Sequence, residues 1–159
     1  MTEPDSDASD APDVITFPPV IFIAFYAIGY ITDRAFPAEL GTPYARYTVG
    51  GALIALSIIL VTWAVARFLR AGTHMDVRKP ATALVTDGPY RLSRNPMYLA
   101  ATLLYAGFAI TFSLPITLAF LPVCLTVLRI GIISREEAYL DRKFGDAYRN
   151  YKARVRRWL

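Results

Sequence analysis

Residues 97–128 read MYLAATLLYAGFAITFSLPITLAFLPVCLTVL, which is 32 residues without a single Asp, Glu, Lys, Arg or His. A bilayer core of about 30 Å is crossed by a helix of roughly 20 apolar residues, so this run is too long for one crossing. Ser113, Leu114 and Pro115 lie near its middle, and proline removes a hydrogen-bond donor from a helix. The run therefore predicts a tight helical hairpin, with membrane helices at residues 96–113 and 115–133.

Two more apolar segments of membrane length precede this run, at residues 14–32 and 47–69. The chain has 159 residues, 55% of them hydrophobic, and its mean hydropathy of +0.36 is high for a soluble domain. We therefore predict an all-α integral membrane protein with about four transmembrane helices in one domain, residues 14–159. The acidic segment at residues 1–13 is predicted to be a disordered tail.

The distribution of positive charge predicts the orientation. Of the 17 Lys and Arg residues, six lie in residues 67–94 and nine in residues 129–159, whereas only Arg34 and Arg46 lie between the first two helices. The positive-inside rule then places both termini and both basic segments in the cytoplasm. This topology explains the pI of about 9.3, so the lipid bilayer is the expected partner and nucleic acid is not. Cys124 is the only cysteine, and no metal site is expected.

Two cytoplasmic segments carry the candidate functional residues. A loop at residues 71–95 starts with the helix-ending signal Ala71-Gly72-Thr73 and finishes at Asn95-Pro96, a typical helix start with Asn as the N-cap. The C-terminal helices, residues 134–159, are amphipathic, and Gly145-Asp146 predicts a break with Asp146 capping the second helix. Their apolar stripe is expected to face either lipid headgroups or the other helices; it consists of Leu140, Phe144, Tyr148, Tyr151, Val155 and Trp158.

Each of these features also has a purely structural interpretation. Arg91 and Arg94 are typical positive-inside anchors, and Tyr90 and Tyr98 are typical interfacial aromatics. The adjacent Glu136 and Glu137 fit the solvated first turn of an amphipathic helix. Residues of this kind would also suit a non-enzymatic membrane scaffold, or a relative of an enzyme fold that lacks its cofactor.

Four motifs, in this order, give the chain a family resemblance. They are Ala71-Gly72-Thr73, Leu84-Val85-Thr86-x-Gly88-Pro89-Tyr90, Arg94-Asn95-Pro96-Met97-Tyr98 and Glu136-Glu137-x-x-Leu140-x-x-x-Phe144-Gly145-x-x-Tyr148-x-x-Tyr151. Together they resemble the isoprenylcysteine carboxyl methyltransferase and phospholipid N-methyltransferase superfamily. The resemblance implies an integral-membrane methyltransferase that uses S-adenosylmethionine. In that family the loop, the base of the hairpin and the C-terminal helices enclose the cofactor on the cytoplasmic side.

The resemblance also implies which residues bind the cofactor. Leu84 and Val85 would line the adenosine pocket, whereas Glu136 would bind the polar end, with Glu137 as its neighbour or substitute. The residues that would surround the cofactor are Tyr90, Asn95, Pro96 and Tyr98. Arg94 would meet the cofactor carboxylate. The implied acceptor is an amphiphilic small molecule whose tail stays among the helices, and no catalytic base is identified.

Three positions depart from the family pattern. Asn95 stands where many members have His, and an amide cannot act as a base near neutral pH. Ala100 stands where a glycine is common, which would crowd a close backbone contact. Ile132 aligns with an arginine that holds the substrate carboxylate in the prenylcysteine branch, which argues against a prenylcysteine acceptor.

Overall fold

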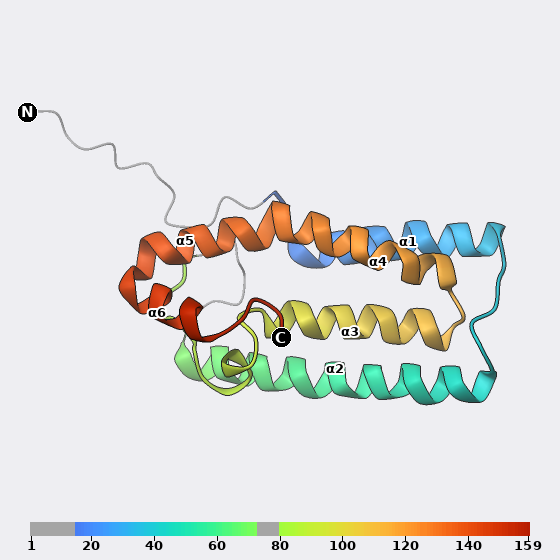
Figure 1. The fold of residues 1–159 in the computed structure, drawn as a ribbon, viewed down its shortest axis with the longest axis horizontal. Helices are drawn as coiled ribbons and strands as arrows, with labels where there is room; N and C mark the ends of the chain where they lie inside the picture. The colour runs from blue at the N-terminus through green and yellow to red at the C-terminus, as the bar shows by residue number, and fades with distance from the viewer. Residues whose placement is uncertain (1–14, 73–79) are drawn as a thin grey trace, which may run out of the picture.

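The computed structural model describes residues 15–72 and 80–159, and all the regular secondary structure in these residues is helical (Figure 1). The all-α class is therefore confirmed. The helices are α1 (Pro18–Ala35), α2 (Pro43–Ala71), α3 (Pro96–Thr111), α4 (Pro115–Leu128), α5 (Ser134–Phe144) and α6 (Asp146–Arg154), with a short 3₁₀ turn η1 (Gly88–Arg91) and a π-helical segment η2 (Arg129–Ile133). The predicted tail, residues 1–13, lies outside the described residues.

Proline and glycine set the helix boundaries. Pro18, Pro43, Pro96 and Pro115 each stand in the first turn of a long helix, where the missing N–H of proline costs no hydrogen bond. Gly72 ends α2 in the left-handed conformation, with φ 64°, as the sequence predicted. The chain also turns between α3 and α4 where predicted. The π-helical segment joins α4 to α5, so the chain is helical from Pro115 to Phe144.

The long helices pack in pairs. Figure 1 shows α2 beside α3 and α1 beside α4, with α5 and α6 beyond one end of the helices. The α2–α3 contact depends on Gly50 and Gly107, because a Cβ atom built on Gly50 would lie 2.7 Å from the carbonyl oxygen of Gly107. On the other side, Asp33 at the end of α1 accepts hydrogen bonds from the N–H groups of Ile116 and Thr117 at 2.9 and 2.8 Å, so it caps the start of α4.

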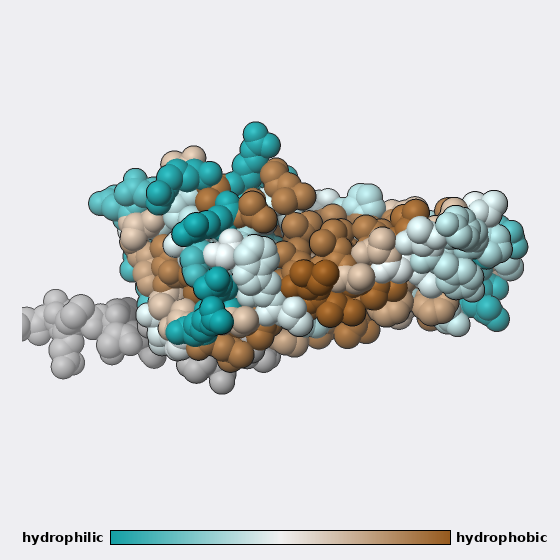
Figure 2. All heavy atoms as spheres, turned by 90° about the horizontal axis from the view of Figure 1, so that it is seen from below, coloured by the Kyte–Doolittle hydropathy of each residue, from teal (hydrophilic) through white to brown (hydrophobic). Residues whose placement is uncertain are grey.

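Large apolar side chains cover much of the outer surface of the helices. Ile23, Ile31 and Ile59 are each more than 60% exposed. In Figure 2 hydrophobic residues form a band along the middle of the molecule, and hydrophilic residues gather toward its ends. By length and composition two helices can cross a membrane, Pro43–Ala71 and Pro115–Phe144. Exposed apolar patches of this size are typical of surfaces that contact a membrane or another protein.

Adjacent glycines in α2 provide a matched test of the close α2–α3 packing. Gly50→Ala should clearly lower the thermal stability in detergent, because the new methyl group would collide with the backbone of α3. Gly51→Ala, one residue on, meets no atom within 4 Å and should be neutral or stabilising by up to about 1 kcal/mol, since alanine is the better helix former. Equal melting temperatures for the two variants would contradict this packing.

Candidate functional site

The adjacent carboxylates Glu136 and Glu137 lie just after the π-helical segment, in the first turn of α5. Because α4, η2 and α5 are continuous, this turn is not a free helix start. Glu137 is buried and Glu136 is partly buried, so the interpretation of the pair as a solvated first turn is wrong. Short π-helical insertions are often found at functional sites, where they re-aim the side chains that follow.

Glu137 is neutralised within the protein by two arginines. Nε of Arg157 donates to Oε1 at 2.9 Å and Nη2 donates to Oε2 at 2.7 Å, a two-pronged geometry that suits a carboxylate. Nη2 of Arg94 lies 3.3 Å from Oε1. The side chain of Glu137 is 8% exposed, so these pairs supply the compensation that a buried charge needs.

Glu136 has no such compensation among the described residues. Its carboxylate accepts a hydrogen bond from the hydroxyl of Tyr98 at 3.0 Å, and it forms no ion pair in this part of the chain. Burial raises the pKa of Glu136 to about 7. The hydrogen bond from Tyr98 opposes this rise, whereas the negative charge of Glu137 adds to it. A cation that reaches this carboxylate would restore its ionised form.

Arg94 is a buried cation whose hydrogen-bond donors are only partly used. Its side chain is only 9% exposed. Nη2 faces Glu137, and the guanidinium lies close enough to the Tyr148 hydroxyl to lower the pKa of that group, but Nε and Nη1 are buried and neither forms a hydrogen bond of good geometry. Leaving a buried donor unsatisfied costs about 1–3 kcal/mol. The arrangement therefore presents guanidinium donors for an anionic ligand close to a carboxylate that lacks a cation.

A buried cluster connects the loop to the C-terminal helices. It contains Val85, Tyr90, Tyr148 and Tyr151, with Leu84 packed against it. Gly88 starts the 3₁₀ turn with φ 58°, and the hydroxyl of Tyr151 donates to the carbonyl of Tyr90 at 2.7 Å. The apolar stripe of the C-terminal helices thus faces the protein and not the headgroups, which resolves the alternative that the sequence left open. Tyr148 and Tyr151 belong to the cluster, although no role at the site was predicted for them.

Burial keeps the tyrosines of this cluster protonated. It raises the pKa of Tyr148 to about 12, with a further rise from the charge of Glu137 and an opposing effect of the Arg94 guanidinium. It also raises the pKa of Tyr90, with a further rise from the charge of Glu136. Their hydroxyls are therefore neutral hydrogen-bonding groups at physiological pH.

Two capping interactions predicted for this region are wrong. Asn95 does precede α3, and Pro96 is buried at its first position, but the Asn95 side chain does not cap the helix. Its Nδ2 instead donates to the carbonyl of Arg157 at 3.0 Å. Asp146 is the first residue of α6, after Gly145, and makes no cap hydrogen bond. The side chain of Asn95 is turned toward Arg157, 62 residues away, and the turn at Gly145 makes Asp146 the first helical residue and not the cap. Local sequence shows neither outcome. Ala100 is buried, and its carbonyl accepts a hydrogen bond from Oγ of Ser57 of α2 at 2.7 Å.

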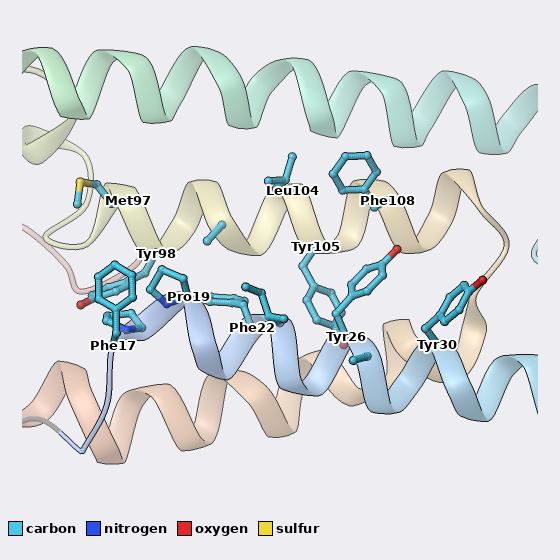
Figure 3. A pocket seen from close by; sticks show the side chains of 14 residues that line it. Phe17, Pro19, Phe22, Tyr26, Tyr30, Met97, Tyr98, Leu104, Tyr105 and Phe108 are labelled. Atoms are coloured by element: carbon cyan, nitrogen blue, oxygen red, sulfur yellow. The ribbon is translucent and has the colours of Figure 1, made fainter. Parts of the chain in front are cut away.

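An apolar groove of about 770 Å³ lies between α1 and α3 (Figure 3). Tyr98 lies near one end of it with Phe17 and Met97, and Tyr30 and Phe108 lie toward the other. The α3 residues from Met97 to Phe108 span about 16 Å at 1.5 Å per residue, roughly half of a 30 Å hydrocarbon core. Since Tyr98 both lines the groove and binds Glu136, the groove adjoins the polar site.

Comparison with known proteins shows the family. Residues 45–147 match the family model described as "Phospholipid methyltransferase". The chain belongs to this family. A curated protein from Haemophilus influenzae, described as an uncharacterized protein, is 49% identical over 65 residues, which are 40% of this chain and all of that protein. The match to the family model extends from the start of α2 into α6, so it contains the loop, Arg94, Glu136 and Glu137. Membership of a methyltransferase family and the two long apolar helices together indicate a membrane methyltransferase.

The raised pKa of Glu136 predicts how stability depends on pH. The folded pKa of about 7 exceeds the ordinary value of 4.5, so the folded protein binds this proton more tightly than the unfolded chain does. Without ligand, stability should therefore fall as the pH rises from about 4.5 to about 7, by up to about 3 kcal/mol. In the Glu136→Gln variant this part of the fall should vanish. Thermal unfolding in detergent measures both proteins, and parallel curves across this window would refute the assignment.

Proposed function

We propose that the protein transfers a methyl group from S-adenosylmethionine to an amphiphilic acceptor at the membrane surface. One observation carries the proposal: within residues 15–72 and 80–159, Glu136 is a partly buried carboxylate with no ion pair, and Arg94 is a buried guanidinium whose Nε and Nη1 form no hydrogen bond of good geometry. The methionine end of the cofactor carries an ammonium and a carboxylate. These two charges complement the two unmet groups of the site.

The donor set fits the rest of the cofactor as well. Glu136 would hold the ammonium and Arg94 the carboxylate, whereas Leu84, Val85 and Tyr90 would supply an apolar wall for the adenosine. Pro96 and Asn95 would border the same space at the start of α3. Glu137 is already engaged by Arg157 and Arg94, so we assign it to support of Arg94 and not to direct contact with the ligand. When bound, the cofactor supplies an electrophilic methyl group.

The residues of the chain contribute binding, orientation and exclusion of water. Methyl transfer needs the acceptor atom in line with the methyl group, and holding reactants in such a geometry supplies much of a rate enhancement. The tyrosine cluster around the site is buried, which keeps water away from the reacting groups. Asn95 cannot remove a proton near neutral pH, so we assign it no role as a base.

The groove between α1 and α3 is the proposed site for the acceptor tail. Its lining is almost wholly apolar, its length along α3 matches about one leaflet, and its Tyr98 end adjoins the polar site. An acceptor lying in this groove would bring its reactive head to Tyr98 and Glu136 while its tail remained in an apolar environment.

The membrane arrangement is part of the same proposal. Helices α1 to α4 would each cross the bilayer, with α3 and α4 forming a helical hairpin. The abundance of Lys and Arg in the loop and after residue 129 would place the active site and both termini in the cytoplasm. A cysteine introduced at Thr82, in a Cys124→Ala background, should label only after the cells are permeabilised, and labelling of intact cells would refute this orientation.

Replacement of Glu136 tests cofactor binding. Glu136→Gln should weaken S-adenosylmethionine binding about 10- to 100-fold, because hydrogen bonds to charged groups contribute about 1.5–3 kcal/mol. Glu39→Gln, which removes an exposed carboxylate between α1 and α2, should leave the affinity unchanged. Calorimetry on the purified protein in detergent measures all three. If the Glu136 variant binds as tightly as the parent, Glu136 lies outside the cofactor site. A scaffold or a cofactor-free relative would show no binding at all.

Filling the groove tests the tail site. Ala101 lines the groove on α3, and Ala101→Phe should reduce binding of lysophosphatidylethanolamine, a single-chain amphiphile, several-fold while preserving S-adenosylmethionine affinity. Ala119→Phe adds the same ring at an exposed position of α4 and serves as the control. Native mass spectrometry measures lipid occupancy. Equal occupancy in both variants would show that the tail binds elsewhere.

A further inference from the structure

The chain after α6 runs across the start of α3. We name residues 155–158 the C-terminal strap. The carbonyl of Arg156 accepts from the N–H of Arg94 at 2.9 Å, and the carbonyl of Arg157 accepts from Oγ of Ser93 and Nδ2 of Asn95, both at 3.0 Å. Trp158 packs against the buried cluster that contains Tyr98 and Ile132. These contacts fix the backbone of Arg157 beside the proposed cofactor site.

The side chain of Arg157 takes most of the hydrogen-bonding capacity of Glu137. Its bonds of 2.9 and 2.7 Å occupy both carboxylate oxygens, whereas the contact from Nη2 of Arg94 is longer, at 3.3 Å. A carboxylate this deeply buried requires a cation. Without Arg157, the guanidinium of Arg94 is the group already in place to supply one, and it has two spare buried nitrogens, Nε and Nη1.

We propose that Arg157 is a positioning residue: by engaging Glu137, it keeps Nε and Nη1 of Arg94 free for the carboxylate of the ligand. This inference rests on the proposed function, because it takes that ligand to be S-adenosylmethionine. Arg157 lies outside the matched residues 45–147, and nothing in the local sequence separates it from the arginines beside it. Its role follows from the three-dimensional contact with Glu137.

A purely structural tie and a positioning role predict different binding data. If Arg157 only holds the strap in place, its loss would weaken every ligand of the site equally. If it keeps Arg94 free, its loss should affect ligands that carry a carboxylate and spare those that lack one. Removing the charge of Glu137 as well should then restore binding, because Arg94 would no longer be drawn to that carboxylate.

The experiment measures the affinities of S-adenosylmethionine and decarboxylated S-adenosylmethionine for the full-length protein in detergent, by calorimetry. Arg157→Gln should weaken binding of the first ligand at least about tenfold and change binding of the second less than about threefold. The double variant Arg157→Gln with Glu137→Gln should recover most of the lost affinity. Arg154→Gln, at an exposed arginine of α6 that bonds its own helix, should change neither affinity.

Several results would overturn the proposal. These are an unchanged affinity in Arg157→Gln, an equal loss for both ligands, or a double variant that binds as weakly as the single one. If Arg157→Gln does not fold, Arg157→Lys replaces it. Lysine keeps the charge but cannot engage both oxygens in the same plane, so a smaller loss confined to S-adenosylmethionine is expected, and no loss would refute the role. A parent protein that binds neither ligand would instead refute the proposed function, which separates the two failures.

Discussion

One buried carboxylate, Glu137, connects three segments that lie far apart in the chain. It belongs to α5, Arg94 precedes α3, and Arg157 belongs to the strap after α6. The side chain of Glu137 is only 8% exposed, and leaving it without any cation would be far more costly than losing a surface ion pair. The relative positions of the loop, α3 and the C-terminal helices therefore depend on this cluster, and the proposed cofactor site lies among those elements.

The adjacent carboxylate, Glu136, has no ion pair among the described residues. In the same part of the chain it receives one hydrogen bond, from Tyr98, and burial raises the pKa of Glu136 because it disfavours the ionised form. Sites that bind charged ligands commonly contain such perturbed groups, because the ligand supplies the missing compensation. Under the proposed function, the two neighbouring glutamates have separate roles: Glu137 is paired within the protein, whereas Glu136 binds the ligand.

Tyr98 joins two very different environments. Its ring lines the groove between α1 and α3, and its hydroxyl reaches Glu136. Along the groove from Tyr98 to Phe108 the lining side chains are apolar. Around Glu136 the neighbouring groups are charged or form hydrogen bonds. A protein that brings a lipid-like acceptor to a charged cofactor needs such a junction, since neither molecule is stable in the environment of the other.

The sequence by itself determined the helical class, the turn between α3 and α4, the glycine end of α2, the family, and several residues that the structure gathers at one end of the helices, among them Tyr98, Arg94 and Glu136. These features follow from local rules, because charge-free runs, proline, glycine and short motifs act over a few residues. Only the tertiary structure decided that Asn95 binds the strap instead of capping α3, that Glu137 is already paired, and that Arg157 pairs it. Those outcomes depend on contacts between residues 20 to 62 positions apart. A buried charge pairs with whichever partner the fold brings beside it, and the spacing of residues along the chain does not encode that choice.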